Sequence, residues 1–194
     1  MSLMNQGGRF YHTTRHIGHM KDELRKSGFW GSRSRHPILA PLANDANDAL
    51  MIAIYYHDVV YGPGASDNEE RSAELMEANF SYMSNTVLRH AVKLIMATRH
   101  NEKPKTVSEK LMADLDLTIL GQSERRFNIY EMQLREEYLA AGIDASDYCA
   151  GRVMFLEGML RRRSIYFTEY FAKKYESRAR ANMRGLVGRL VGSQ

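Results

Sequence analysis

The stretch AIYYHDVVYG, residues 53–62, places His57 and Asp58 side by side at the end of an apolar run. A buried carboxylate without a partner is destabilising or takes up a proton, so it requires a cation nearby. We expect the pair at the C-terminal end of a helix, where the negative pole of the helix dipole strengthens this requirement. Imidazole and carboxylate together suit a divalent metal ion. Taken alone, however, such a pair is more typical of a satisfied structural contact.

Two other segments carry residues of the same kinds. His12 and His16 are four residues apart, and on a helix they share one face about one turn from each other. Asp114 and Asp116 lie within ADLDLTIL, an apolar segment in which an aspartate is again unfavourable unless it is paired. The coincidence of three such segments favours a metal centre. The alternative is a buried hydrogen-bonded network without a metal.

The segments that carry these residues are expected to be helices. Apolar residues recur with helical spacing, as in residues 17–24, and strand-like alternation is nearly absent. Asp67 with Glu70, and Thr106 with Glu109, have the spacing of capping boxes. The sequence therefore predicts an all-α fold, a single helical bundle with about seven to eight helices. The expected helices are one that contains HTTRH, one over about 45–59 that stops before GPG, one capped at Asp67, one over about 87–98, one from Thr106 to Gly121, and longer ones near 123–141, 146–163 and 167–190.

The length of 194 residues suits one sizeable core, and we expect a single domain over residues 11–190 after a flexible lead-in over residues 1–10. The lone Cys149 forms no internal disulfide. The sequence has no signal-peptide pattern and no apolar stretch of transmembrane length. These features predict a cytoplasmic protein with no membrane partner.

The net charge is +4, from 27 basic and 23 acidic residues, and it favours anionic ligands. Much of the excess lies in the last third of the chain, where the basic side chains are best explained as solvated helix faces. No recognisable nucleic-acid module accompanies them, so a nucleic acid is not the expected partner.

The order His16, His57, Asp58 and Asp116 resembles the H…HD…D signature of the HD-domain superfamily of metal-dependent phosphohydrolases. A wider set of motifs resembles a bacterial branch described as predicted metal-dependent phosphohydrolases of that superfamily. The motifs are YHTTRHI (11–17), YYHDVVYG (55–62), DNEERSAEL (67–75), ATRH (97–100), DLDLTILG (114–121) and RARANM (178–183). They span nearly the whole chain, and they imply an HD-type helical bundle.

The resemblance implies that His16, His57, Asp58 and Asp116 are the ligands of one divalent ion, with Asp114 as the alternative to Asp116. Two imidazoles and two carboxylates suit Mn, Fe, Co, Ni or Zn better than an all-oxygen calcium cage, and Mg is a further candidate. The donor set does not choose among these metals.

The segment YHTTRH also resembles the YHxxxH element of cyclic-nucleotide phosphodiesterases. That likeness implies that His12 is a general acid, while Asp58 is both a ligand and a catalytic residue. The implied reaction is hydrolysis of a small phosphorylated substrate, such as a nucleotide, through a metal-activated water. The side chains expected to bind the substrate are Arg15, Glu69, Arg71, Arg99 and His100.

Other functions stay open at this point. Some HD-fold proteins are diiron oxygenases, which need further histidines between the HD pair and the last aspartate, and His90 and His100 occupy that interval. A non-catalytic module that binds a nucleotide is another alternative. Assembly into a homo-oligomer is also open. His19 is expected to face solvent.

Overall fold

The computed structural model describes residues 3–29 and 45–192. Within these ranges the chain forms eight α-helices and three short 3-10 helices and contains no strand, which confirms the predicted all-α fold and its number of helices. The α-helices are α1 (Thr14–Ser27), α2 (Asp45–Tyr56), α3 (Asn68–Asn79), α4 (Asn85–Met96), α5 (Val107–Leu117), α6 (Glu124–Ala140), α7 (Ala145–Arg161) and α8 (Glu169–Gly192). The 3-10 helices are η1 (Leu3–Asn5), η2 (Ala97–Arg99) and η3 (Thr118–Gly121).

The helix ends follow from local side-chain chemistry. The Thr106 hydroxyl accepts from the backbone N–H of Glu109, and the Glu109 carboxylate accepts from the backbone N–H of Thr106, so the predicted capping box of α5 is confirmed. The capping box predicted at Asp67 is wrong, because its side chain makes no cap hydrogen bond and its backbone is not extended. Helix α1 ends at Gly28, whose φ of 73° lies in the left-handed region that glycine adopts without strain.

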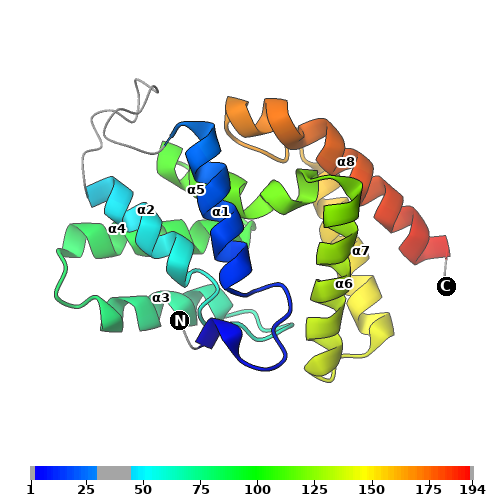
Figure 1. Ribbon diagram of the computed structural model, residues 1–194, viewed down its shortest axis with the longest axis horizontal. Coiled ribbons are helices and arrows are strands. Elements are labelled where there is room, and N and C mark those ends of the chain that lie inside the picture. Colours follow the sequence, from blue (N-terminus) through cyan, green and yellow to red (C-terminus); the bar gives the residue numbers. More distant parts are fainter. Residues whose placement is uncertain (1–2, 30–44, 193–194) are drawn as a thin grey trace.

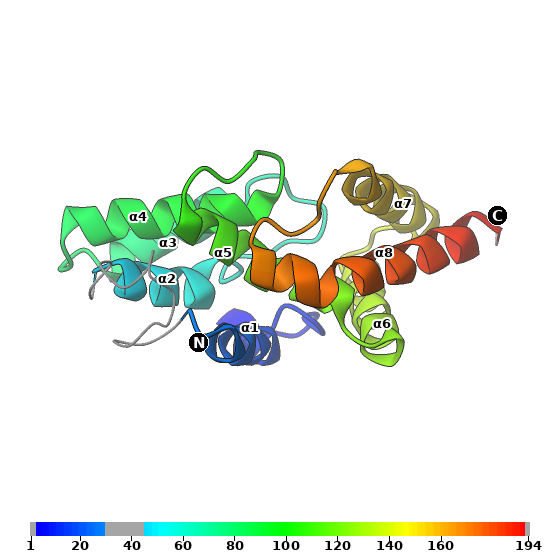
Figure 2. The ribbon, with the colours of Figure 1, turned by 90° about the horizontal axis from the view of Figure 1, so that it is seen from above.

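The helices form an elongated bundle with two ends (Figure 1). Helices α2, α3 and α4 pack at one end, and α6, α7 and α8 pack at the other. Helices α1 and α5 lie between the two groups, as the perpendicular view also shows (Figure 2). Because α5 contacts both α1 and α2, its side chains reach the middle of the molecule, where Leu111, Met112 and Leu115 are buried.

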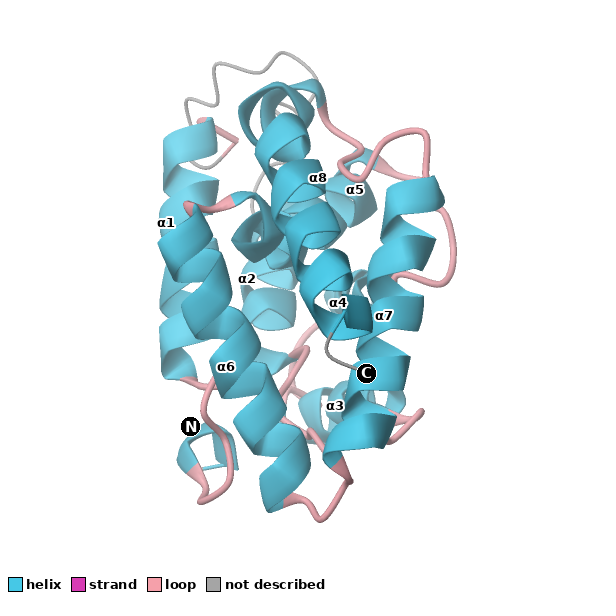
Figure 3. Cartoon of the chain, turned by 90° about the vertical axis from the view of Figure 1, so that its right-hand side faces the viewer, coloured by secondary structure: helices cyan, strands magenta, loops and turns pink. Residues whose placement is uncertain are grey.

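Helix α8 crosses the end of the bundle formed by α6 and α7 (Figure 3). It packs against η3, and a Cβ added at Gly121 would lie 2.5 Å from Cβ of Tyr175 on α8. Arg178 donates through Nε to the Gly121 carbonyl, and Asn182 donates through Nδ2 to the carbonyls of Leu120 and Gln122. Arg178 and Asn182 of RARANM therefore hold η3 and the residue after it, the segment that directly follows the end of α5.

Part of the predicted lead-in contacts the helical body. Residues 1–2 lie outside the described residues, but the Met4 side chain is buried in the core. Arg9 donates through Nη1 to the Asp58 carbonyl at 2.6 Å and through Nη2 to the Val59 carbonyl at 3.0 Å. The segment before α1 is thereby tied to the turn that follows α2. None of the described helices combines the length and the apolar character needed to cross a bilayer.

Candidate metal centre

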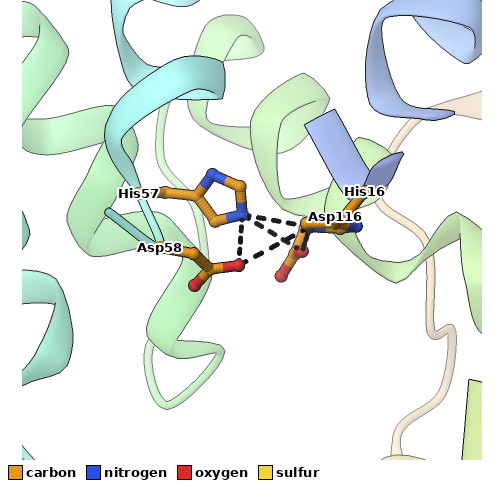
Figure 4. Close-up of side chains that lie close together, drawn as sticks. All are labelled: His16, His57, Asp58 and Asp116. Atoms are coloured by element: carbon orange, nitrogen blue, oxygen red, sulfur yellow. Dashed lines mark hydrogen bonds and ion pairs between the residues drawn. The ribbon is translucent and has the colours of Figure 1, made fainter. Parts of the chain in front are cut away.

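Four of the predicted side chains meet in the middle of the bundle (Figure 4). His16 comes from α1, His57 and Asp58 from the turn that follows α2, and Asp116 from α5. One ligand atom from each of the four lies within 4.8 Å of the other three. Within the described residues, this is the group of histidine, cysteine or acidic side chains whose spacing suits a metal ion. We call it the His/Asp cluster.

The distances between donor atoms suit a shared ion. Nε2 of His57 lies 2.9 Å from Oδ2 of Asp58 and 3.6 Å from Oδ1 of Asp116. Nε2 of His16 lies 3.1 Å from Oδ1 of Asp116, 3.7 Å from Oδ2 of Asp58 and 3.1 Å from Nε2 of His57. Metal–ligand bonds of about 2.0–2.2 Å place neighbouring ligands about 3.0–3.5 Å apart. The spacing of the four donor atoms is thus close to that of neighbouring ligands around a single ion.

The two imidazoles are oriented for this role by groups outside the cluster. Nδ1 of His57 lies 3.2 Å from the Ile54 carbonyl, which accepts a hydrogen bond from the N–H at that nitrogen and leaves Nε2 for a ligand bond. Nδ1 of His16 lies 2.9 Å from the Tyr11 hydroxyl. Both rings therefore direct Nε2 toward the carboxylates, as metal-binding histidines do.

Burial differs between the two kinds of ligand. The side chains of His16 and His57 are 1% exposed, while those of Asp58 and Asp116 are 15% and 20% exposed. A ligand or water can therefore approach from the carboxylate side.

Electrostatics keep the carboxylates charged. Burial alone would raise the pKa of Asp58, but the charges of His57 and His12 and the hydrogen bond from His57 outweigh it and lower that pKa below its usual range. Burial likewise opposes ionisation of Asp116, but hydrogen bonds from three imidazoles, with His100 first, hold its pKa well below the usual value. The centre therefore presents two carboxylates that attract a cation.

His12 is not on α1, so the prediction that it shares a helix face with His16 is wrong. It precedes Thr13, the residue that caps α1, because the extended backbone of Thr13 starts the helix only at Thr14. Its ring stacks on that of Tyr61, with 3.9 Å between centroids, and lies 6.2 Å from the His16 ring. His12 thus reaches the edge of the cluster from the segment before the helix.

Glu137 on α6 holds His12 in place, and the sequence analysis missed it. Its side chain is fully buried, and Oε1 accepts from the backbone N–H groups of Phe10, Tyr11 and His12 at 2.7–2.9 Å. Oε2 lies 2.6 Å from Nδ1 of His12. Burial would lower the pKa of His12, but the charge of Asp58 and the bond to Glu137 raise it. The spacing of Tyr130, Leu134 and Glu137 at i, i+4 and i+7 is the signal that could have found it, because it places Glu137, unlike its exposed neighbour Glu136, on the buried face of the helix.

Asp114 and Asp116 have different surroundings. Asp116 lies in the cluster, whereas Asp114 is fully buried and accepts from the backbone N–H groups of Phe167 and Thr168 at 2.7 and 2.8 Å. The Thr168 hydroxyl donates to the same carboxylate. Asp114 therefore fixes the connection between α7 and α8, and Asp116 is the aspartate of this helix that faces the other three ligands.

The residues predicted to bind a substrate are dispersed. His100 reaches the centre, with Nε2 2.8 Å from Oδ2 of Asp116. Glu69 lies close enough to Asp58 that burial, together with the charge of that carboxylate, raises its pKa. Arg99 forms an ion pair with Glu70 and donates to the Ser66 carbonyl, so its charge is already engaged.

Arg15 and Arg71 are both exposed. Arg15 lines a cavity of about 180 Å³ on the far side of His16, together with His19. His19 does not face solvent freely as predicted, because Nε2 lies 3.0 Å from the Thr118 hydroxyl and Nδ1 lies 3.4 Å from Nη2 of Arg126. Burial and the Arg126 charge lower the pKa of His19 to about 4.

Comparisons of this chain with protein-family models, with curated proteins and with solved structures found no match. The class that the fold and the cluster define is therefore that of an all-α protein with a buried histidine–aspartate centre. That centre has the donor set and the spacing to hold a divalent ion.

Proposed function

We propose that this chain is a metal-dependent phosphohydrolase that acts on a small phosphorylated substrate such as a nucleotide. The observation that carries the proposal is the convergence of His16, His57, Asp58 and Asp116 from three separate segments on one point. The resemblance of their order to the HD-domain signature supports the same activity. A centre of two imidazoles and two carboxylates is suited to Mn, Fe, Co, Ni, Zn or Mg.

A divalent ion bound by these four side chains supplies Lewis-acid polarisation of a phosphoryl oxygen and lowers the pKa of a water. Other groups of the chain fix the positions of these four side chains. The Ile54 carbonyl and the Tyr11 hydroxyl set the two imidazole orientations, and the backbone of Asp58 is anchored by Arg9. Ligands that are held in this way need little reorganisation when charge develops on the reacting phosphoryl group.

His12 is the proposed general acid. Its Nδ1 is bonded to Glu137, so the proton available for transfer lies on Nε2, at the opposite edge of the ring. Burial opposes the charged form of His12, but the charge of Asp58 and the bond to Glu137 raise its pKa and so favour the protonated ring. Donation to the departing oxygen by a well-placed imidazole contributes about 10²- to 10⁴-fold in rate. Glu137 acts through His12 and is a positioning residue.

The diiron alternative has less support among the described residues. His100 bonds to Asp116, but His90 lies on α4, where Glu109 is the acidic group that acts on it electrostatically. His90 does not belong to the His/Asp cluster. The described histidines and carboxylates thus favour one ion rather than two.

The test is metal content followed by hydrolysis. We expect about one transition ion per chain in the wild type after purification without chelators, and its loss in Asp58→Ala. The matched control is Asp22→Ala, which removes an exposed carboxylate paired with Arg25 at i,i+3. If the wild type and Asp58→Ala bind Mn and Zn equally well, the proposed metal centre is wrong. Metal-loaded wild type is then assayed on phosphate monoesters, diesters and nucleotides, and absence of turnover on all of them would contradict the proposed activity.

A further inference from the structure

A cavity with several basic side chains in its lining lies beside the His/Asp cluster. It has a volume of about 520 Å³ and is formed by the connection between α4 and α5 and the connection between α7 and α8, which approach each other in Figure 2. Its cationic side chains are Lys103 from the first connection and Arg162 and Arg163 from the second. We call it the basic pocket. Glu102 is the one carboxylate that lines it, so positive charge exceeds negative charge there.

Among the described residues, no carboxylate lies within ion-pair distance of Lys103, Arg162 or Arg163. Arg162 is half-buried and donates through Nη2 to the His100 carbonyl. Guanidinium and ammonium groups that line one cavity without a carboxylate partner favour an anionic ligand, and phosphate oxygens match their donors well.

The walls of the basic pocket are held rigidly. Glu176 on α8 accepts from the backbone N–H groups of Ile165 and Tyr166 at 3.0–3.3 Å. Arg180, from the same helix, donates through Nη2 to the carbonyls of Arg162 and Arg163 at 2.7 and 3.3 Å. The backbone that carries the two pocket arginines is thus fixed before any ligand arrives, which reduces the entropy lost on binding.

His100 connects the basic pocket to the cluster. It lines the pocket, and its Nε2 bonds to Asp116. Its side chain is 9% exposed, and its Nδ1 is buried without a hydrogen-bond partner. A ligand group in the pocket can supply that partner. One side chain therefore separates the pocket from a proposed metal ligand.

We propose that the basic pocket binds a phosphate group of the substrate other than the one that reacts at the His/Asp cluster. The substrate class is then a molecule with at least two phosphates, such as a nucleoside diphosphate or triphosphate. This inference rests on the proposed function for the identity of the ligand. The inference that the basic pocket binds an anion is independent of the proposed function, because it depends only on the basic side chains and the fixed backbone of the pocket.

The first experiment measures binding without catalysis. Pyrophosphate is titrated calorimetrically into Asp58→Ala protein, with and without the double change Lys103→Ala/Arg163→Ala, at constant ionic strength because exposed charges are screened by salt. The control is Lys173→Ala/Arg184→Ala, which removes two exposed basic residues from α8 and changes the net charge equally. We expect binding about tenfold or more weaker in the pocket variant alone, as loss of charge-assisted hydrogen bonds predicts. Equal pyrophosphate binding in both double variants overturns the proposal.

The second experiment identifies the source of the phosphate. In the metal-loaded chain with Asp58 intact, the pocket variant should raise KM about tenfold for a nucleoside diphosphate and leave KM unchanged for p-nitrophenyl phosphate. Weaker pyrophosphate binding with unchanged KM for both substrates overturns the assignment to substrate and identifies a free phosphate as the ligand. If the wild type hydrolyses neither substrate while pyrophosphate binding still depends on the pocket residues, the proposed function fails and the phosphate site stands.

Discussion

The Tyr11 hydroxyl lies 2.9 Å from Nδ1 of His16, on the ring edge opposite the nitrogen that faces Asp116. The Tyr11 ring packs edge-on against that of Tyr130, with 4.4 Å between centroids, and Arg152 donates to the Tyr130 hydroxyl. Arg152 is itself paired with Glu131, so a buried network that spans α6 and α7 supports the orientation of a ligand on α1. Elements remote from the His/Asp cluster thus contribute to its geometry.

Tyr11→Phe should weaken metal binding by about 10- to 100-fold, because the imidazole of His16 loses the partner that orients it. The measurement is a competition titration of Mn or Zn against a chromophoric chelator. Tyr82→Phe is the control, since Tyr82 is 79% exposed. Equal metal affinity in the two variants would show that the hydroxyl has no role in orienting His16.

Glu137→Gln should lower kcat by about 10²-fold and leave metal content unchanged. The amide still accepts from the backbone N–H groups of residues 10–12, but it no longer favours the charged form of His12, in which Nδ1 donates to the carboxylate and Nε2 carries the proton for transfer. The control is Glu136→Gln, which changes the exposed neighbour on the same helix. The assay is steady-state turnover of the substrate that the wild type hydrolyses best. A loss of bound metal in Glu137→Gln, or a kcat equal to that of Glu136→Gln, would contradict the role given to His12.

His19 should make the protein less stable as pH falls from about 6.5 to about 4. Its folded-state pKa of about 4 lies below the usual 6.5, so over this range the unfolded chain binds a proton that the folded chain does not. The folded state therefore loses stability on acidification, by an amount on the order of 2 kcal/mol. His19→Gln should reduce this loss. The measurement is the urea unfolding midpoint of wild type and variant at pH 7, 6 and 5. Parallel pH profiles for the two proteins would rule out His19 as the source of the acid-induced loss of stability.

Gly121→Ala should destabilise the fold by about 1–3 kcal/mol, because the added methyl group meets Cβ of Tyr175 at 2.5 Å in a packed interior. The control is Gly151→Ala on α7, where nothing lies within 4 Å of the added group. There, the better helix propensity of alanine should stabilise the protein by about 0.5–1 kcal/mol. Thermal or urea unfolding measures both. Effects of the same sign at the two positions would contradict the close packing of α8 on η3.

The sequence predicted the helices from local signals, as in helix α5, which shows its start through Thr106 and Glu109, three residues apart. His57, Asp58 and Asp116 stand out because they interrupt apolar runs, whereas the choice of His16, and of Asp116 over Asp114, came from the resemblance to the HD-domain signature. Asp67 had the same local signal as Thr106 but makes no cap bond, and its backbone is not extended as that of Thr106 is. In this loop the adjacent Asn68 side chain bonds the backbone of Gly62.

The groups that position the cluster could not be predicted in this way. Glu137 lies 125 residues from His12 along the chain, and neither segment contains a pattern that indicates which residue the other side chain will contact. His12 was misplaced for a related reason. The spacing of His12 and His16 fits a helix, but the cap at Thr13 starts that helix after His12. Long-range hydrogen bonds and the exact start of a helix depend on packing that one sequence does not contain.

The bonds from Glu137 to residues 10–12 determine when the site can form during synthesis. His12 leaves the ribosome early, but its carboxylate partner emerges only with α6, after all four members of the cluster. A nascent chain that ends before α6 contains His16, His57, Asp58 and Asp116, but it lacks both Glu137, which holds His12, and Tyr130, which packs against Tyr11. The orientation of His12 and of the His16 ring therefore depends on segments that are synthesised after all four members of the cluster.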